Sequence, residues 1–112
     1  MEKNNFQVRT QEYFEAFRTK NISYLNELYS NDIILIDWDV NVIGKSEVLN
    51  INNILFKEDF TIEVLNTIQY ENQTINTLFI QIPKHNIAIE VIDVITFNYK
   101  TFEIEKIRAY KG

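Results

Sequence analysis

The chain has 112 residues, 46% of them hydrophobic, and a formal net charge of −5 at pH 7. This size is typical of one domain, so we expect residues 1–112 to form a single domain around one apolar core. The apolar content excludes a disordered chain, and the negative charge argues against nucleic acid as a partner. The absence of cysteine excludes disulfides and thiolate chemistry.

The sequence contains no signal for a membrane, a metal or a cofactor. Charged residues and asparagines interrupt the N-terminus where a signal peptide needs an apolar stretch, and no segment has the length of a membrane span. The single histidine, His85, falls in a predicted turn, and no glycine-rich phosphate loop is present. We therefore expect a cytoplasmic protein that needs no membrane anchor, metal ion or cofactor.

The N-terminal half of the sequence predicts helices and one strand. Apolar residues recur at helical spacing over residues 6–20, again over residues 22–29, and again over residues 48–55. Each of these stripes predicts an amphipathic helix with one face buried. The run 33–38 is continuous and rich in isoleucine, which predicts a short strand buried on both faces.

The C-terminal half predicts a meander of antiparallel strands, over residues 60–70, 74–82, 87–97 and 102–110. The loop lengths place Tyr70 beside Thr74 and Ile82 beside Ile87, which brings the apolar faces to one side of a sheet. Helices followed by a meander predict an α+β fold. We expect a cone in which the N-terminal helices cover a strongly curved antiparallel or mixed sheet and enclose an apolar pocket.

Three polar side chains interrupt the apolar face of the predicted sheet. Asp93 lies in the middle of its strand among isoleucine and valine, and Asn76 lies directly opposite in the predicted register. Asn66 interrupts the inward face of the first strand of the meander. A buried carboxylate must be paired, hydrogen-bonded or protonated. The cluster therefore predicts either a ligand site or a structural cluster that fixes the register.

Five segments in chain order resemble the nuclear-transport-factor-two-like superfamily, in its SnoaL-like and ketosteroid-isomerase branch. The segments are YFEAF, SNDIILIDW, GKSEV, VIDVITF and IRAYKG. In ketosteroid isomerases, a tyrosine of the first helix, an aspartate at the end of the first strand and an aspartate on a late strand carry the chemistry. By position these match Tyr13, Asp37 and Asp93. The resemblance implies Asp37 as the general base, with Tyr13 and a protonated Asp93 as donors to an enolate oxygen.

The resemblance implies a protein that holds a small apolar molecule, with isomerase chemistry on a steroid-like or polyketide-like carbonyl compound. The alternative is a non-catalytic ligand-binding or protein-interaction domain of the same fold. We expect Phe17, Trp38 and Val91 to contact the ligand, together with Asn66 and Asn76. In the isomerases the residue directly after the base is usually proline, whereas in this sequence it is Trp38.

The outward face of the sheet predicts a homodimer. Its side chains are mostly uncharged, and a patch of this size is larger than a monomer usually exposes. The residues predicted on this face are Thr61, Leu65, Thr67, Ile75, Phe79, Ile92, Val94 and Thr96.

The register of the last hairpin decides which side chain lies opposite Asp93. Without a bulge, Phe97 pairs with Phe102 and Asp93 faces Lys106, which keeps the carboxylate ionised. Ile104 and Ile107 are both apolar although they have opposite parity. We therefore predict a bulge near Glu105 and Lys106 that turns Lys106 outward and leaves Asp93 protonated.

Overall fold

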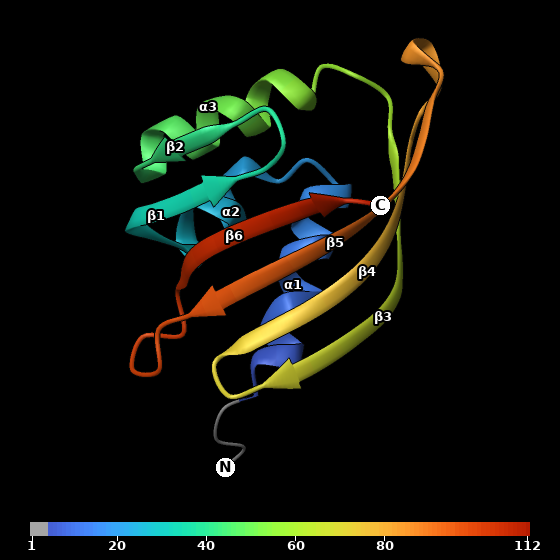
Figure 1. Cartoon of the computed structure of the whole chain (residues 1–112). Helices are drawn as coiled ribbons and strands as arrows, with labels where there is room; N and C mark the ends of the chain where they lie inside the picture. Colours follow the sequence, from blue (N-terminus) through green and yellow to red (C-terminus); the bar gives the residue numbers. More distant parts are fainter. Residues whose placement is uncertain (1–4) are drawn as a thin grey trace.

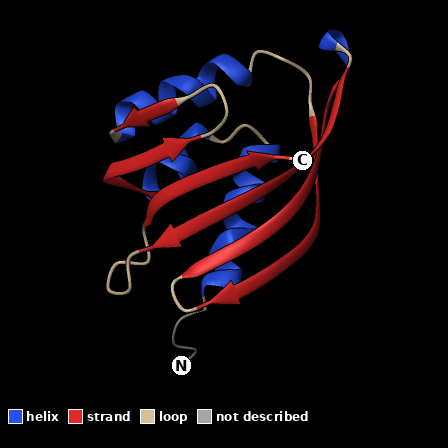
Figure 2. Cartoon of the chain, viewed as in Figure 1, coloured by secondary structure: helices blue, strands red, loops and turns tan. Residues whose placement is uncertain are grey.

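The computed structural model describes residues 5–112 and shows α-helices packed on one face of a curved, mixed β-sheet (Figures 1 and 2). The helices are α1 (Phe6–Arg18), α2 (Ile22–Leu28) and α3 (Lys45–Leu55). The strands are β1 (Tyr29–Ile36), β2 (Asn41–Ile43), β3 (Thr61–Tyr70), β4 (Gln73–Ile82), β5 (Ile87–Phe97) and β6 (Ile104–Lys111), with a 3₁₀ turn η1 (Pro83–His85). The predicted α+β class and the curved sheet are confirmed. None of the helices within the described part of the chain is long and apolar enough to cross a membrane.

The sheet has the strand order β2-β1-β6-β5-β4-β3. Strand β1 is parallel to β6, and the other neighbours are antiparallel. This pairing places the N-terminal strand beside the last strand, so that both ends of the chain contribute to the centre of the sheet. Strand β2 was not predicted, because three residues are too few to show an alternating pattern.

The core fills the space between the helices and the face of the sheet that curves around them. Phe6 of α1 is fully buried and stacks on Phe97 of β5 with 5.0 Å between the ring centroids. Leu25 of α2 and Val48 of α3 are also fully buried. Each helix therefore contributes its apolar stripe to one common core, as the helical spacing predicts.

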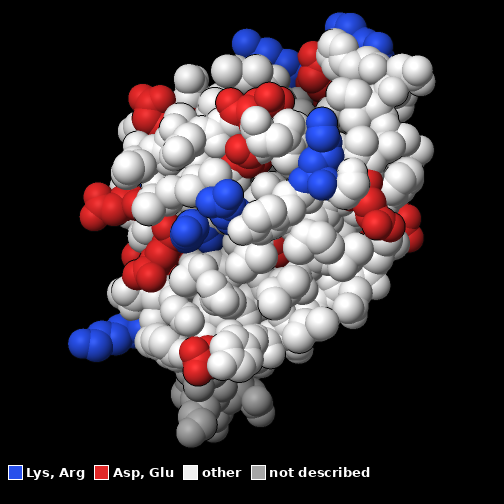
Figure 3. All heavy atoms as spheres, in the orientation of Figure 1, with Lys and Arg blue, Asp and Glu red and all other residues white. Residues whose placement is uncertain are grey.

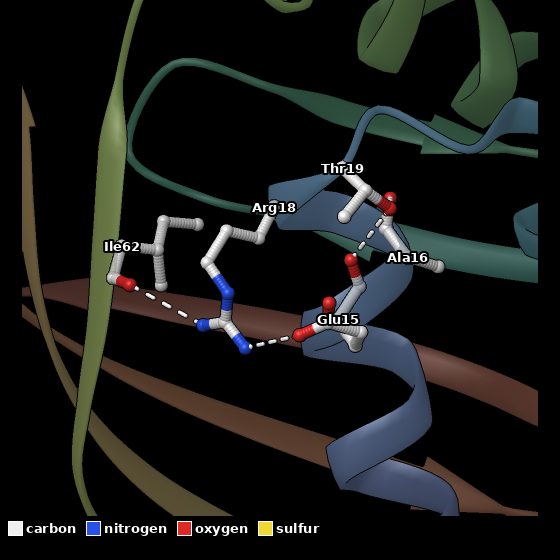
Figure 4. Close-up of polar contacts among 5 residues, drawn as sticks. All are labelled: Glu15, Ala16, Arg18, Thr19 and Ile62. Carbon is white, nitrogen blue, oxygen red and sulfur yellow. Dashed lines mark hydrogen bonds and ion pairs between the residues drawn. The ribbon is translucent and has the colours of Figure 1, made fainter.

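Helix α1 is attached at both ends to β3, the edge strand of the sheet. At its N-terminus, Oε1 of Gln69 accepts hydrogen bonds of 3.1 Å from two backbone N–H groups of the first turn. At its C-terminus, the guanidinium of Arg18 donates to the carbonyl oxygen of Ile62 at 3.4 Å and forms a 2.7 Å ion pair with Glu15 (Figure 4). These contacts fix the direction in which α1 crosses the sheet.

A bulge in β3 reverses the predicted orientation of the residues that follow it. Val64 pairs with Leu78, but the next pair is Asn66 with Thr77, so that Leu65 is an extra residue. The extra residue reverses the alternation of side chains beyond it. Asn66, Ile68 and Tyr70 are therefore exposed instead of facing the core, and Thr67 faces inward instead. Consistently, Tyr70 pairs with Gln73 and not with the predicted Thr74.

The registers of the two later hairpins place Asp93 as predicted. Ile82 pairs with Ile87, and Asn76 pairs with Asp93. In the last hairpin, Thr96 pairs with Lys106 but Phe97 pairs with Ile104, which makes Glu105 the extra residue of a bulge. The prediction of this bulge is confirmed. Lys106 faces away from the core, and the residue opposite Asp93 is Ala109.

The convex face of the sheet is not covered by a helix and carries few charges. Figure 3 shows a mainly uncharged area over β3, β4 and β5, with Lys, Arg, Asp and Glu concentrated around it. The bulge in β3 adds Ile68 and Tyr70 to this face, with exposed fractions of 53% and 64%. Ile75 lies beside Ile68 and is 37% exposed.

We propose that this convex face joins two copies of the chain, and we expect light scattering to give twice the 13.4 kDa chain mass. Ile75→Glu places a charge in the centre of the face and should yield a monomer. Ile54→Glu is the matched control, because Ile54 is 57% exposed on α3, away from the sheet. A wild-type monomer at high micromolar concentration would exclude the dimer.

Candidate functional site

A cavity of about 500 Å³ lies between the helices and the concave face of the sheet. This volume is within the range of small-molecule sites, which is about 300–1,000 Å³. Most of its wall is aliphatic or aromatic. The lining residues that were predicted as site residues are Tyr13, Phe17, Asp37, Trp38, Val91 and Asp93. Asn66 and Asn76 are not among the lining residues.

Asp93 contributes a buried carboxyl group to the wall of the cavity. It is 7% exposed and lies in the middle of β5, between the buried residues Val91 and Ile95. Burial raises the pKa of Asp93 to about 7, and the negative charge of Asp37 is the second cause. No cation or hydrogen-bond donor within residues 5–112 counteracts this shift of the pKa. A large fraction of Asp93 is therefore protonated near neutral pH, as the bulged register predicts.

Tyr13 reaches the same part of the cavity from the middle of α1. Burial raises the pKa of Tyr13 well above its usual value, and repulsion from Tyr29 and Asp93, once these groups ionise at alkaline pH, raises it further. The hydroxyl of Tyr13 also interacts with that of Tyr29 by hydrogen bonding. Tyr13 is therefore a neutral hydrogen-bond donor at every physiological pH.

Tyr29 and Asn52 extend this polar cluster and were missed by the sequence analysis. The hydroxyl of Tyr29 donates a 2.7 Å hydrogen bond to Oδ1 of Asn52, and both residues line the cavity. Tyr29 fits the apolar stripe predicted for the second helix, and Asn52 lies beside such a stripe in α3. Neither residue interrupts a pattern, so the sequence carried no signal for their contact.

Asp37 follows β1 directly and lies at the rim of the cavity. Its Oδ1 atom accepts hydrogen bonds of 2.7 Å from the backbone N–H groups of Asp39 and of Val40. These bonds hold the carboxylate in one orientation within the turn between β1 and β2. No described residue forms a hydrogen bond with the other carboxylate oxygen of Asp37, Oδ2. This oxygen is therefore available to a ligand.

The rim also contains Trp38, Asp39 and Lys111. The ammonium group of Lys111 lies 5.5 Å from the centre of the Trp38 ring, a cation–π geometry. Trp38 is 43% exposed, so that it borders the cavity and the solvent. Lys111 was not predicted, because the last strand was expected to end at residue 110.

Asn76 contacts other residues of the sheet and does not line the cavity. It is fully buried, accepts a 2.8 Å hydrogen bond from Thr67, and donates to Thr74 and to the backbone oxygen of Asp93. These bonds satisfy its amide and connect β3, β4 and β5. Of the two interpretations of the polar cluster, the structural one therefore describes Asn76.

No protein-family model and no curated protein sequence matches the chain, whereas its structure closely matches solved structures. An NTF2-like protein of unknown function from Cytophaga hutchinsonii superposes with a TM-score of 0.82 at 14% identity, over 96% of this chain and 89% of that one. The chain has the NTF2-like fold. The fold is thus the one that the five sequence segments indicate.

Two further structures with the NTF2-like fold are similar at equally low identity. A Shewanella putrefaciens protein proposed to be a SnoaL-like polyketide cyclase has a TM-score of 0.84 at 9% identity, over 96% of this chain and 79% of that one. A Kribbella flavida protein proposed to be a ketosteroid isomerase has a TM-score of 0.79 at 9% identity, over 98% of this chain and 79% of that one. At such identities the likeness concerns the fold.

The two asparagines of the predicted site should differ sharply in their effect on stability. Asn76→Ala removes a buried amide and leaves its partners unsatisfied, which should lower the free energy of unfolding by about 2 kcal/mol. Asn66→Ala is the matched control at an exposed position and should change it by less than about 0.5 kcal/mol. Urea unfolding of both variants measures the difference. Equal effects would contradict the register of β3.

The buried Asp93 should make the protein less stable as the pH rises. The folded state holds the proton up to a pKa of about 7, whereas the unfolded chain releases it near 3.8. The stabilisation is therefore complete below about pH 4 and is lost as the pH rises through 7, by on the order of 4 kcal/mol. Asp93→Asn should remove this dependence, so that urea unfolding of the variant and the wild type diverges between pH 4 and 8. Parallel pH profiles would show that Asp93 is ionised in the folded state.

Proposed function

We propose that this protein binds a small apolar carbonyl compound in the cavity and isomerises it through an enolate. The observation that carries the proposal is the position of Asp93 and Tyr13. Two neutral donors lie in one apolar cavity whose rim holds the carboxylate of Asp37. A protonated acid and a carboxylate near each other, in different environments, are suited to acid–base catalysis.

The reaction that fits these groups is a proton transfer between two carbons of the substrate. The Asp37 carboxylate removes a proton from the carbon next to the carbonyl group, and the electron pair moves to the carbonyl oxygen. Tyr13 and protonated Asp93 donate hydrogen bonds to this enolate oxygen. Asp37 then returns the proton to the distant end of the conjugated system, which shifts the double bond. No proton is gained or lost overall.

The apolar wall supports a hydrophobic substrate. Phe17 of α1 packs edge-on against Phe56 and Phe60 near the end of α3, with centroid distances of 5.0 and 5.7 Å. On the opposite wall, Ile80 pairs with Ile89 and lines the cavity. The similar structures proposed to be a ketosteroid isomerase and a polyketide cyclase favour a ring compound with a carbonyl group.

Isomerisation of a β,γ-unsaturated steroid ketone to its conjugated isomer tests the proposal by ultraviolet absorbance. Asp37→Asn should lower kcat by about 10²–10⁴-fold because it removes the base. Tyr13→Phe should lower it by about 10²-fold because it removes one donor. For the wild type, kcat should fall as the pH rises through about 7, where Asp93 ionises. Asp93→Asn retains a donor and should lose this alkaline decline.

The alternative is a non-catalytic binding domain, and the same assay separates the two. Asn66→Ala serves as the control, because Asn66 is exposed on the convex face. The proposal of catalysis fails if the ketone binds, as NMR shift changes would show, but neither isomerises nor exchanges its α-protons with deuterium. Binding without exchange would leave the cavity as a ligand site alone.

A further inference from the structure

Lys111 is the only cationic side chain among the described residues that line the cavity. It pairs with Val91 across β5 and β6, and Ala109 pairs with Asp93. Because residues two positions apart share a face, Lys111 follows Ile107 and Ala109 along the concave side of β6. Its side chain therefore enters the mouth of the cavity, although the residue itself is exposed.

No carboxylate among residues 5–112 forms an ion pair with Lys111. The ion pairs within the described part of the chain involve Arg9, Arg18 and His85, and none of them includes Lys111. Asp37 lines the same rim, but one of its oxygens is held by backbone N–H groups of its own turn. Lys111 instead lies over the Trp38 ring, which restricts the position of the ammonium group while leaving its hydrogens available.

We propose that the ligand of this cavity carries one anionic group, a carboxylate, which Lys111 binds at the mouth above Trp38. This inference rests on the proposed function, because it concerns the substrate of the same cavity. The substrate class is then an apolar keto acid, with its carbonyl group at Tyr13 and Asp93 and its carboxylate at the rim. Lys111 is the residue that selects acids over neutral ketones.

The register also gives the order of the two polar groups of the proposed ligand along the cavity. Asp93 and Val91 are neighbours on the same face of β5, and positions two residues apart are separated by about 7 Å along a strand. Lys111 lies opposite Val91, so the carboxylate sits one such step nearer the mouth than the carbonyl group. A phosphate ester is disfavoured, because its second negative charge would lie near Asp37 and Asp39.

A pair of fluorescent probes that differ by one anionic group tests the inference. 8-Anilinonaphthalene-1-sulfonate and N-phenyl-1-naphthylamine share an apolar ring system, and only the first carries a charge. Lys111→Met should weaken binding of the sulfonate probe about three- to tenfold and leave binding of the neutral probe unchanged. Lys111→Arg should retain the affinity, and added salt should reduce the difference between wild type and Lys111→Met.

Lys106→Met is the matched control on the same strand. It removes the same charge from the convex face, where Lys106 lies opposite Thr96. The inference is overturned if Lys106→Met weakens binding of the sulfonate probe more than Lys111→Met does. It is also overturned if Lys111→Met weakens binding of both probes equally. If the neutral probe does not bind the wild type, the cavity is no apolar ligand site and the proposed function fails as well. If it binds and only the charge dependence is missing, the inference alone fails.

Discussion

The position of one extra residue in β6 determines which side chains line the cavity around Asp93. Glu105 has no partner in β5, and every residue after it is shifted relative to Asp93. Because side chains alternate between the two faces of a strand, this shift turns Ile107 inward and Lys106 outward. If Glu105 were not an extra residue, Arg108 would face Asp93 and the buried carboxylate would be half of an ion pair. The bulge instead gives the carboxyl group an apolar environment, and its raised pKa follows from that.

An unpaired buried carboxyl group is costly for folding, and the structure limits this cost in two ways. Asp93 keeps its proton near neutral pH, which avoids most of the penalty for burying a charge. The backbone around it is held by Asn76, whose amide donates to the carbonyl oxygen of Asp93. The polar cluster predicted from sequence therefore has two parts with different roles. Asn76 maintains the sheet, and Asp93 presents an acid to the cavity.

The sequence predicted the fold and singled out two acids that line the cavity, Asp37 and Asp93, but it did not predict the details that depend on strand pairing. The three helical stripes and the alternation in β4 and β5 are local patterns that packing did not override, so these elements were found with small errors at their ends. The bulge at Leu65 cannot be recognised in the sequence, because Ile68 and Tyr70 continue the apolar alternation of β3. In the structure these two residues lie on the convex face. The contact of Tyr29 with Asn52 joins two different elements, and no local pattern reports such a contact.

The two bulges determine which side chains lie on each face of the sheet. One enlarges the apolar convex surface, and the other sets the row of residues that lines the cavity. The bulge in β3 moves Ile68 and Tyr70 to the convex face, where they enlarge the apolar surface that we propose joins two copies of the chain. The bulge in β6 aligns Ile107, Ala109 and Lys111 on the concave face, from the core to the mouth of the cavity. The concave row therefore runs from an aliphatic floor to a cation. In the ligand that we propose, the apolar part lies against Ile107 and Ala109 and the carboxylate lies beside Lys111.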